Sequence, residues 1–295
     1  MIGEKKNPWL TGLIRLPFII LALSMIIPYY LMTIGAFKPV PELIQNPPTF
    51  TVENPSLNNF YDETPNAPQH IPGLFQRFQE APWGFGSAYV NSVVITVIVT
   101  VVSLMMASAA GYVLAKGRVP GRNVIFFIIV ASMMIPWQVT IIPNFLTMKA
   151  FGWINTFAGI VVPGLSRAFA VFFLRQYMLS LPDELVDAAK LDGANEFRIW
   201  WSIILPLVRP AMTAMAIFVM LSEWNNFVWP LIIVRDQAHL TLPLALANLN
   251  SVLSGPGNVG VLMAAALLTS LPTVIFFLLF QKQFVEGIAL SGTKG

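Results

Sequence analysis

Six long apolar runs, separated by polar segments, organise the chain. Four of them contain no Asp, Glu, Lys or Arg, and the other two contain one charged residue each. A helix that crosses a bilayer needs about 20 mostly apolar residues, because the hydrocarbon core is about 30 Å thick. All six runs are long enough, so the pattern predicts an all-α integral membrane protein with six transmembrane helices. The predicted spans are 16–37, 89–115, 123–148, 150–174, 210–234 and 259–280.

The first run, 16–37, follows basic residues, as the core of a signal peptide would. The apolar core of a secretory signal is only about 7 to 15 residues long, and no small-residue cleavage site follows this run closely. We therefore expect 16–37 to be retained as a span.

Basic residues in the connecting segments indicate the orientation of the spans. Lys and Arg near a span resist translocation, so the side that holds more of them faces the cytoplasm. With the N-terminus inside, the outer segments hold only Lys38, Arg77, Lys149 and Arg235. The inner segments hold Lys5, Lys6, Arg15, Lys116, Arg118, Arg122, Arg175, Lys190, Arg198, Arg209, Lys282 and Lys294. We expect both termini in the cytoplasm, external loops at 38–88 and 235–258, and a cytoplasmic loop at 180–206.

The external loop 38–88 is rich in Pro and Asn and carries scattered aromatic residues. Two interpretations remain open for it. It forms an external cap or partner surface, or it is a solvated linker whose aromatic side chains rest at the membrane interface. No internal repeat is visible, so 1–295 is predicted to be a single transmembrane domain.

Composition removes most catalytic chemistry. Hydrophobic residues make up 56% of the chain and charged residues 11%, against about 25% charged residues in ordinary globular proteins. There is no Cys, and the two histidines, His70 and His239, lack metal-ligand spacing. The net charge of +3 follows from the orientation of the spans and gives no reason to expect nucleic acid as a partner. We expect no catalytic residue and no bound metal.

The cytoplasmic loop 180–206 carries the clearest local signals. Ser180 and Asp183 have the spacing of a capping box, which predicts a helix start. Gly193 can adopt the left-handed conformation that ends a helix, and Asn195 can cap a second helix. The first helix is acidic, so an anionic inner leaflet should repel it, and a protein partner is favoured over a lipid surface.

Three short motifs in this loop resemble the EAA loop of ABC-importer permeases. That pattern is E-A-A, a Gly four residues after the second Ala, and I-x-L-P further on. Here Asp replaces the usual Glu. The matching residues are Asp187, Ala188, Ala189, Asp192, Gly193, Leu205 and Pro206.

Other motifs resemble the carbohydrate branch of that family, the maltose-transporter type. They are Asn91-Ser92, Met134-Ile135-Pro136, Trp224-Asn225-Asn226 and Thr241-Leu242-Pro243, and the resemblance extends from about the first span to the last residue. It implies a six-span permease with the type I importer fold in a bacterial cytoplasmic membrane. Such a subunit pairs with a second homologous permease, two ATPase subunits that use ATP and Mg, and an external sugar-binding protein. The EAA loop would be the helix that couples the ATPases to the permease.

The chain itself has no phosphate-binding loop of the G-x-x-x-x-G-K-[ST] type, so we expect ATP to bind elsewhere. The resemblance predicts a sugar as the solute. The alternatives are a permease of the same fold for an amino acid, a polyol or glycerol phosphate, or a secondary transporter. A secondary transporter would need its own coupling-ion site, and a membrane enzyme would need a cluster of catalytic residues.

Arg167 and Glu223 are the two charged residues inside the predicted spans. An ionisable side chain in a span costs about 2.5 to 3.5 kcal/mol on insertion scales, so each is a functional candidate. One interpretation places them on the solute path with Trp224, Asn225 and Asn226, since sugars bind by aromatic stacking and amide hydrogen bonds. The other makes them a buried pair, or a contact to the partner permease.

The external loop 235–258 resembles the segment of the maltose-type subunit that reaches into the binding protein's sugar cleft. Small polar side chains in this loop could compete for sugar contacts and ease release. The candidates for contact with the binding protein are Asn248, Asn250, Ser251 and Ser254.

Overall fold

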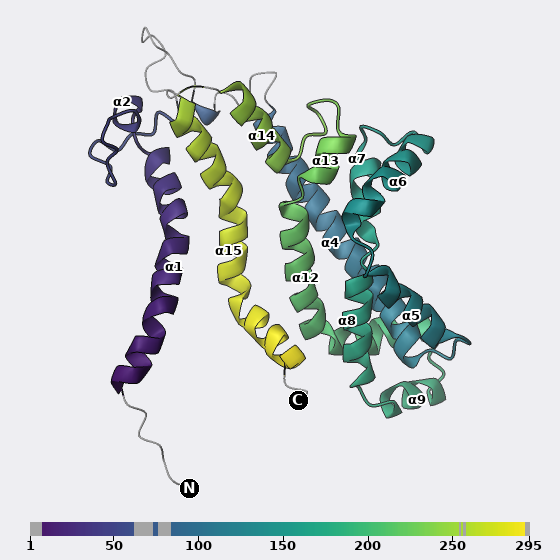
Figure 1. The fold of residues 1–295 in the computed structure, drawn as a ribbon. Coiled ribbons are helices and arrows are strands. Elements are labelled where there is room, and N and C mark those ends of the chain that lie inside the picture. Colours follow the sequence, from purple (N-terminus) through teal and green to yellow (C-terminus); the bar gives the residue numbers. More distant parts are fainter. Residues whose placement is uncertain (1–7, 62–72, 76–83, 254, 256–257, 293–295) are drawn as a thin grey trace. The chain divides into compact units, whose positions relative to one another are not determined.

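The computed structural model describes residues 8–61, 73–75, 84–253, 255 and 258–292 (Figure 1). All regular structure in these ranges is helical, which confirms the predicted all-α class. The helices are α1 (Pro8–Ala36), α2 (Val40–Leu43), α4 (Phe85–Lys116), α5 (Arg122–Ser132), α6 (Trp137–Ala150), α7 (Phe157–Val161), η1 (Val162–Leu165), α8 (Ala168–Leu179), α9 (Glu184–Leu191), α10 (Glu196–Ile199), η2 (Trp200–Ile204), α11 (Leu205–Leu207), α12 (Arg209–Trp224), α13 (Val228–Ile233), α14 (Leu242–Val252) and α15 (Val259–Gly292).

The chain forms two compact units. The first comprises Met1–Trp83 and Leu246–Leu271, and the second comprises Gly84–Ala245 and Pro272–Gly295. Several residues named above lie outside the described part of the chain: Lys5, Lys6, His70, Arg77, Ser254 and Lys294.

In the first unit, α1 meets the first half of α15 where a glycine permits close approach. A Cβ atom on Gly35 would lie 2.0 Å from the Met263 sulfur, so any other residue would require the Met263 side chain to move. Just beyond α1, the side-chain amide of Asn59 donates to the carbonyls of Ala36 and Lys38 at 3.0 and 2.8 Å. These bonds fix the turn that follows α1.

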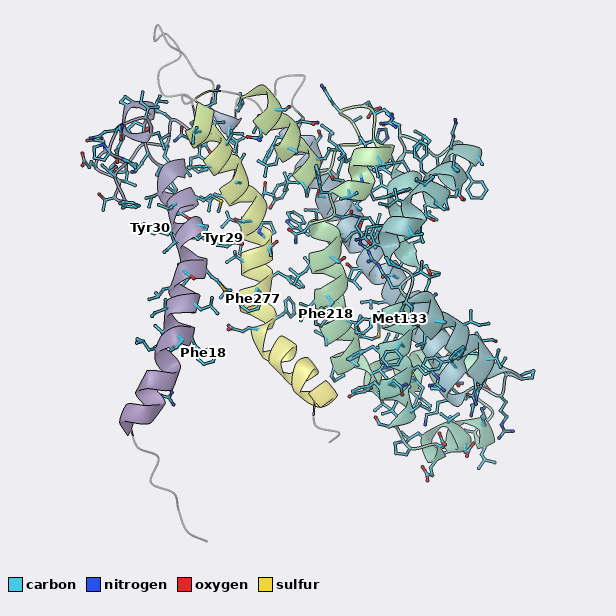
Figure 2. All side chains as sticks on the ribbon, in the orientation of Figure 1. Phe18, Tyr29, Tyr30, Met133, Phe218 and Phe277 are labelled. Atoms are coloured by element: carbon cyan, nitrogen blue, oxygen red, sulfur yellow. The ribbon has the colours of Figure 1, made fainter. Side chains whose placement is uncertain are left out.

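Most of α1 exposes large apolar side chains. Figure 2 shows Phe18, Tyr29 and Tyr30 projecting from this helix, and Phe18 is 69% exposed. Such a surface is unfavourable in water and is favourable in hydrocarbon, where the helix satisfies all of its own backbone hydrogen bonds. The exposed apolar surface therefore agrees with a lipid-facing span.

The second unit is built around α4, which packs mainly against α8 and α12. The buried residues of α4 are mostly small, among them Ser92, Ser103, Ala107 and Gly111. At Gly111 an added Cβ would come within 3.2 Å of the Arg175 backbone nitrogen. Small residues at such contacts let membrane helices approach closely, which is the main source of their packing energy.

Three of the predicted spans are not single straight helices. The run 123–148 is divided into α5 and α6, which are bent by 101° at Met133–Pro136. Pro136 has no N–H to donate to the preceding turn, and it becomes the residue that caps α6. The run 210–234 is divided at Asn225–Phe227, between α12 and α13.

The predicted span 150–174 begins later than the apolar pattern suggests. Gly152 and Asn155 adopt positive φ angles of 70° and 59°, so the chain turns there and the helix starts only at Phe157. A short 3₁₀ helix, η1, contains Pro163 and interrupts the span before α8 continues to Leu179.

Four described helical stretches are long and apolar enough to cross a membrane, and six if each bent pair counts as one span. The four are Arg15–Ala36, Phe85–Lys116, Phe157–Leu179 and Val259–Gln281. The second bent pair joins Glu196–Leu207 to Arg209–Trp224 at 79°.

Candidate functional site

A cavity of about 750 Å³ lies in the second unit, at the helix breaks described above. It is bordered by α6, by the interrupted segment from α7 to the start of α8, and by the end of α12 with the turn into α13. The lining residues are Trp137, Thr140, Ile141, Asn144, Ile160, Pro163, Gly164, Ser166, Arg167, Ser222, Glu223, Asn225, Asn226, Phe227, Val228 and Trp229.

Arg167 and Glu223 meet in the wall of this cavity. The Arg167 Nη2 atom lies 2.6 Å from the Glu223 Oε2 atom, and the Arg167 Nε–H donates to the carbonyl of Gly164 at 2.8 Å. The side chain of Glu223 is 2% exposed, whereas that of Arg167 is 26% exposed. The break at η1 leaves the Gly164 carbonyl free of the helical ladder, so it can accept this bond. Arg167 therefore neutralises a buried carboxylate and keeps part of its guanidinium accessible.

Of the two predicted amides, Asn226 joins this pair and Asn225 only lines the cavity, whereas the predicted tryptophan does neither. Asn226 donates to Glu223 Oε1 at 3.1 Å, and Asn225 is exposed at the turn. Trp224 does not line the cavity and packs edge-on against Tyr89 of α4, with ring centroids 5.7 Å apart. Helix α12 ends at Trp224, and the chain then turns into α13. Trp224 and Asn225 therefore face different surroundings although they are adjacent.

The aromatic surface of the cavity comes instead from Trp137, Phe227 and Trp229. Of these, Trp137 is 52% exposed, and Trp229 donates its indole N–H to the Gly159 carbonyl at 3.0 Å. Trp137 was not predicted as a site residue. Its position directly after Pro136, at the start of α6, could have indicated it. Taken together, the wall offers amides, hydroxyls, a compensated ion pair and an aromatic face, which suits a polar, uncharged solute.

The loop 180–206, which is predicted to be cytoplasmic, has the expected arrangement of a helix, a glycine turn and a second helix. Gly193 has φ of 78°, its N–H donates to the Lys190 carbonyl, and Ala194 N–H donates to the Ala189 carbonyl. These are the two bonds of a Schellman motif. Asn195 caps α10 by accepting a bond from the Arg198 N–H at 2.9 Å.

The predicted capping box is wrong. Asp183 is the N-cap residue of α9 and makes no side-chain cap bond, while the Ser180 hydroxyl donates to the Tyr177 carbonyl at 2.7 Å. The reason is that the Asp183 carboxylate pairs with Lys116 of α4 instead, with Lys116 Nζ 2.5 Å from Asp183 Oδ1. This hydrogen bond from Lys116 lowers the pKa of Asp183.

The motif residues of this loop are divided between two faces. Asp187, Ala188, Asp192 and Gly193 are exposed, whereas Ala189 is buried within the chain. Leu191 is 90% exposed, and sequence reasoning did not single it out because an isolated Leu near a helix end carries no signal. At the second part of the motif, Leu205 is half-buried and Pro206 is exposed.

A second carboxylate of the loop, Glu196, is also tied to α4. Its Oε2 atom accepts a bond from the Tyr112 hydroxyl at 2.5 Å, and its Oε1 atom lies 2.8 Å from Lys190 Nζ. Hydrogen bonds from Lys190 and Tyr112 lower the pKa of Glu196. Both carboxylates are therefore ionised near neutral pH.

At the other end of the second unit, the predicted external side, a polar cluster joins two loops. Asn155 donates to Asp236 Oδ2 at 2.7 Å, and its own Oδ1 accepts the backbone N–H of Arg235 at 2.8 Å. The Asp236 Oδ1 atom lies 2.7 Å from His239 Nδ1. The hydrogen bonds from His239 and Asn155 lower the pKa of Asp236.

The predicted binding-protein contacts lie at the end of α14. Asn248, Asn250 and Ser251 are exposed there, and Ser251 donates to the Asn248 carbonyl at 2.7 Å. Among the residues that the structure describes, no group of three or more His, Asp or Glu side chains is placed to hold a metal ion.

Comparison with known proteins places these features in context. The family model described as "Binding-protein-dependent transport system inner membrane component" matches residues 107–289. The arabinooligosaccharides transport system permease protein AraQ of Halalkalibacterium halodurans is 36% identical over 294 residues, covering 99% of each chain. The lactose transport system permease protein LacG of Rhizobium radiobacter is 31% identical and covers 90% of each chain.

Two further proteins are similar. The sn-glycerol-3-phosphate transport system permease protein UgpE of Yersinia pestis is 32% identical over 204 residues, covering 69% of this chain and 73% of that protein. The crystal structure of a bacterial ABC transporter involved in the import of the acidic polysaccharide alginate contains a chain that aligns with a TM-score of 0.80 and 22% identity. That alignment covers 96% of this chain and all of the other, which shows a shared fold.

Proposed function

Because this chain belongs to the family of inner membrane components of binding-protein-dependent transport systems, we propose that it is the permease subunit through which an ABC importer moves a sugar into the cell. The chain is a multi-pass inner membrane protein with the importer-permease fold that the sequence predicted, and it is a transport subunit rather than an enzyme. Family members work with a solute-binding protein and with ATPase partners.

The cavity around Arg167 and Glu223 is the observation that carries the assignment of the solute path. Its volume of about 750 Å³ falls in the range of small-molecule sites, which is about 300 to 1,000 Å³. Trp137 offers a face for stacking on sugar C–H groups, and Asn144, Asn225 and Asn226 offer amides for sugar hydroxyls. The full-length similarity to permeases for arabinooligosaccharides and lactose supports a mono- or oligosaccharide as the solute.

The finer arrangement of the importer belongs to the same proposal. A second homologous permease completes the path, and two ATPase subunits, which bind ATP and Mg, sit at the cytoplasmic face. The exposed surface of α9, with Asp187, Ala188, Leu191 and Asp192, contacts one ATPase. Both termini lie in the cytoplasm, and the external end of α14 contacts the binding protein through Asn248, Asn250 and Ser251.

Uptake by the reconstituted complex tests this function. The chain would be co-purified with its partner permease and ATPases, placed in proteoliposomes and supplied with its binding protein and internal ATP. The radiolabelled probes are arabinotriose, lactose and glycerol 3-phosphate. We expect uptake of a neutral sugar that stops when the binding protein is omitted or a non-hydrolysable ATP analogue is used. Uptake of glycerol 3-phosphate alone, or uptake driven by an ion gradient without ATP, would overturn the proposal.

A matched pair of variants separates the path from the scaffold. Asn144 lines the cavity, while Thr147 lies less than one turn further along α6, is exposed and does not line it. Asn144→Leu is expected to raise the KM for sugar uptake, whereas Thr147→Val is expected to leave it unchanged. Equal effects of the two substitutions would remove the cavity from the solute path.

A further inference from the structure

The cytoplasmic end of α4 holds the coupling loop at two points. Lys116 Nζ contacts Asp183 at 2.5 Å and also donates to the Leu181 carbonyl at 2.6 Å, so it grips the segment where α9 begins. One helical turn earlier, Tyr112 donates to Glu196 at the first position of α10. Residues four apart lie on the same face of a helix, so one face of α4 binds the start of α9 and the start of α10, on either side of the glycine turn.

Burial distinguishes these contacts from ordinary surface ion pairs. The Lys116 side chain is 4% exposed and Tyr112 is 2% exposed, although Asp183 is 78% exposed. An exposed pair contributes little because both side chains lose entropy on pairing. Here the donors are already fixed by packing, so the loop carboxylates meet donors that lose little further freedom. Lys190 closes the arrangement by joining α9 to Glu196 across the glycine turn.

The same helix reaches the cavity. Val99, thirteen residues before Tyr112 and therefore about 20 Å along the axis, packs against the break beside Arg167, where an added Cβ on Gly164 would lie 3.3 Å from the Val99 side chain. Tyr89 packs against Trp224, the residue after Glu223. Helix α4 thus contacts both segments that supply the charged pair of the cavity.

The far end of α4 is bound to the predicted external loop. The side-chain amide of Asn91 donates to the carbonyls of Ala238 and Leu240 at 2.8 and 2.9 Å. The Ser92 hydroxyl accepts the backbone N–H of Leu242 at 2.7 Å. A single helix of 32 residues therefore touches the coupling loop, the cavity wall and the external loop.

We propose that Tyr112 and Lys116 are positioning residues that clamp the coupling loop to α4 and so make α4 the element that carries the ATPase motion to the solute cavity. This inference rests on the proposed function, in which α9 docks on an ATPase. Without the clamp, α9 is joined to the membrane helices through the connections at Ser180–Asp183 and at Gly193 and through its buried side chains Val186 and Ala189. We expect these remaining contacts to pass the motion of ATPase closure to the cavity wall less completely.

The test is the number of sugar molecules imported per ATP hydrolysed, measured in proteoliposomes with the complete complex. The test variants are Tyr112→Phe, Lys116→Met and the double variant. We expect the double variant to lower the ratio about five-fold or more, the lower end of typical coupling effects, while ATPase co-purification and ATP turnover persist. Tyr177→Phe, on the neighbouring helix α8, is the control and should leave the ratio unchanged.

Charge reversal provides a second, independent arm. Lys116→Glu alone places two carboxylates together and should uncouple the complex, whereas Lys116→Glu combined with Asp183→Lys restores an ion pair and should recover part of the ratio. An unchanged ratio of sugar imported to ATP hydrolysed in the Tyr112→Phe, Lys116→Met double variant overturns the clamp. Uptake and ATPase activity that fall in parallel at a constant ratio also overturn it, because the residues would then serve assembly only. If the unmodified complex imports no sugar, it is the proposed function that fails.

Discussion

Arg167 and Glu223 illustrate how a membrane segment accommodates two ionised side chains. Each alone would cost about 2.5 to 3.5 kcal/mol on insertion scales. Pairing at 2.6 Å, with further bonds from Asn226 to the carboxylate and from the guanidinium to Gly164, compensates this cost. The sequence left open whether the two residues pair or line a path, and the geometry shows that a pair can also line a cavity.

Replacing one member of the Arg167–Glu223 pair should destabilise the protein more than replacing both. Glu223→Gln leaves the Arg167 charge without its partner, which we expect to destabilise the protein by about 3 kcal/mol, the lower end for buried pairs because Arg167 is partly exposed. The double variant Arg167→Met with Glu223→Gln should be close to the parent in thermal stability, yet impaired in uptake. Thermal unfolding of the detergent-purified complex measures this, and a double variant less stable than Glu223→Gln would contradict it.

The two alanines of α9 should respond differently, because Ala188 is exposed and Ala189 is buried. Ala188 is exposed, so Ala188→Trp should leave folding intact and weaken ATPase attachment. Ala189 packs inside the chain, so Ala189→Trp should destabilise the protein by about 1 to 3 kcal/mol through overpacking. Co-purification of the ATPase and the thermal midpoint separate the two effects. Normal attachment in Ala188→Trp would argue against α9 as the docking helix.

At the scale of elements, packing against α4 determines the second unit. Gly111→Leu should separate α4 from α8, since even a Cβ meets the Arg175 backbone at 3.2 Å. We expect a loss of about 1 to 3 kcal/mol and a lower level in the membrane. Val113→Leu, on an exposed face of the same helix, is the control. Membrane level and thermal midpoint are the readouts, and tolerance of Gly111→Leu would mean that this contact adapts freely.

The breaks within the apolar runs were only partly predictable from the sequence. Pro136 and Pro163 are of a residue type that disfavours a continuous helix. Hydropathy alone could not show that the chain bends by 101° at Met133–Pro136, because bent and straight spans have the same composition. The glycine turn at Gly193 and the cap at Asn195 follow from local chemistry and were predicted correctly. The cap at Ser180 failed because a distant residue, Lys116, binds Asp183.

The direction in which each side chain points was the property least accessible from sequence. Trp224 and Asn225 are adjacent, but only the turn into α13 determines which of them reaches the cavity. The same applies to Ala188 and Ala189, whose small size predicts close contact without saying with which surface. Such choices depend on tertiary packing, for which a single sequence carries no periodic signal when the helices are apolar all round.

For the whole molecule, the polar side chains of the cavity lie at the places where helices are interrupted. The cavity lies where η1, the end of α12 and the α5–α6 bend leave backbone groups outside regular helices, as expected if irregular backbone at membrane depth lines a polar space. Composition excluded most enzymes, and motif spacing identified the permease family. The proposed solute path is inferred from the geometry of the cavity.

Protection of the cavity by sugar tests that path most directly. The chain contains no Cys, so a single Ser222→Cys change places one thiol in the cavity wall, and Thr147→Cys provides a control outside it. A small polar thiol reagent would be applied to the complete complex, trapped with ATP and vanadate, with and without binding protein loaded with the sugar that the uptake assay identifies. We expect sugar to slow modification at position 222 several-fold and to leave modification at position 147 unchanged. Equal modification rates at position 222 with and without sugar would contradict this expectation.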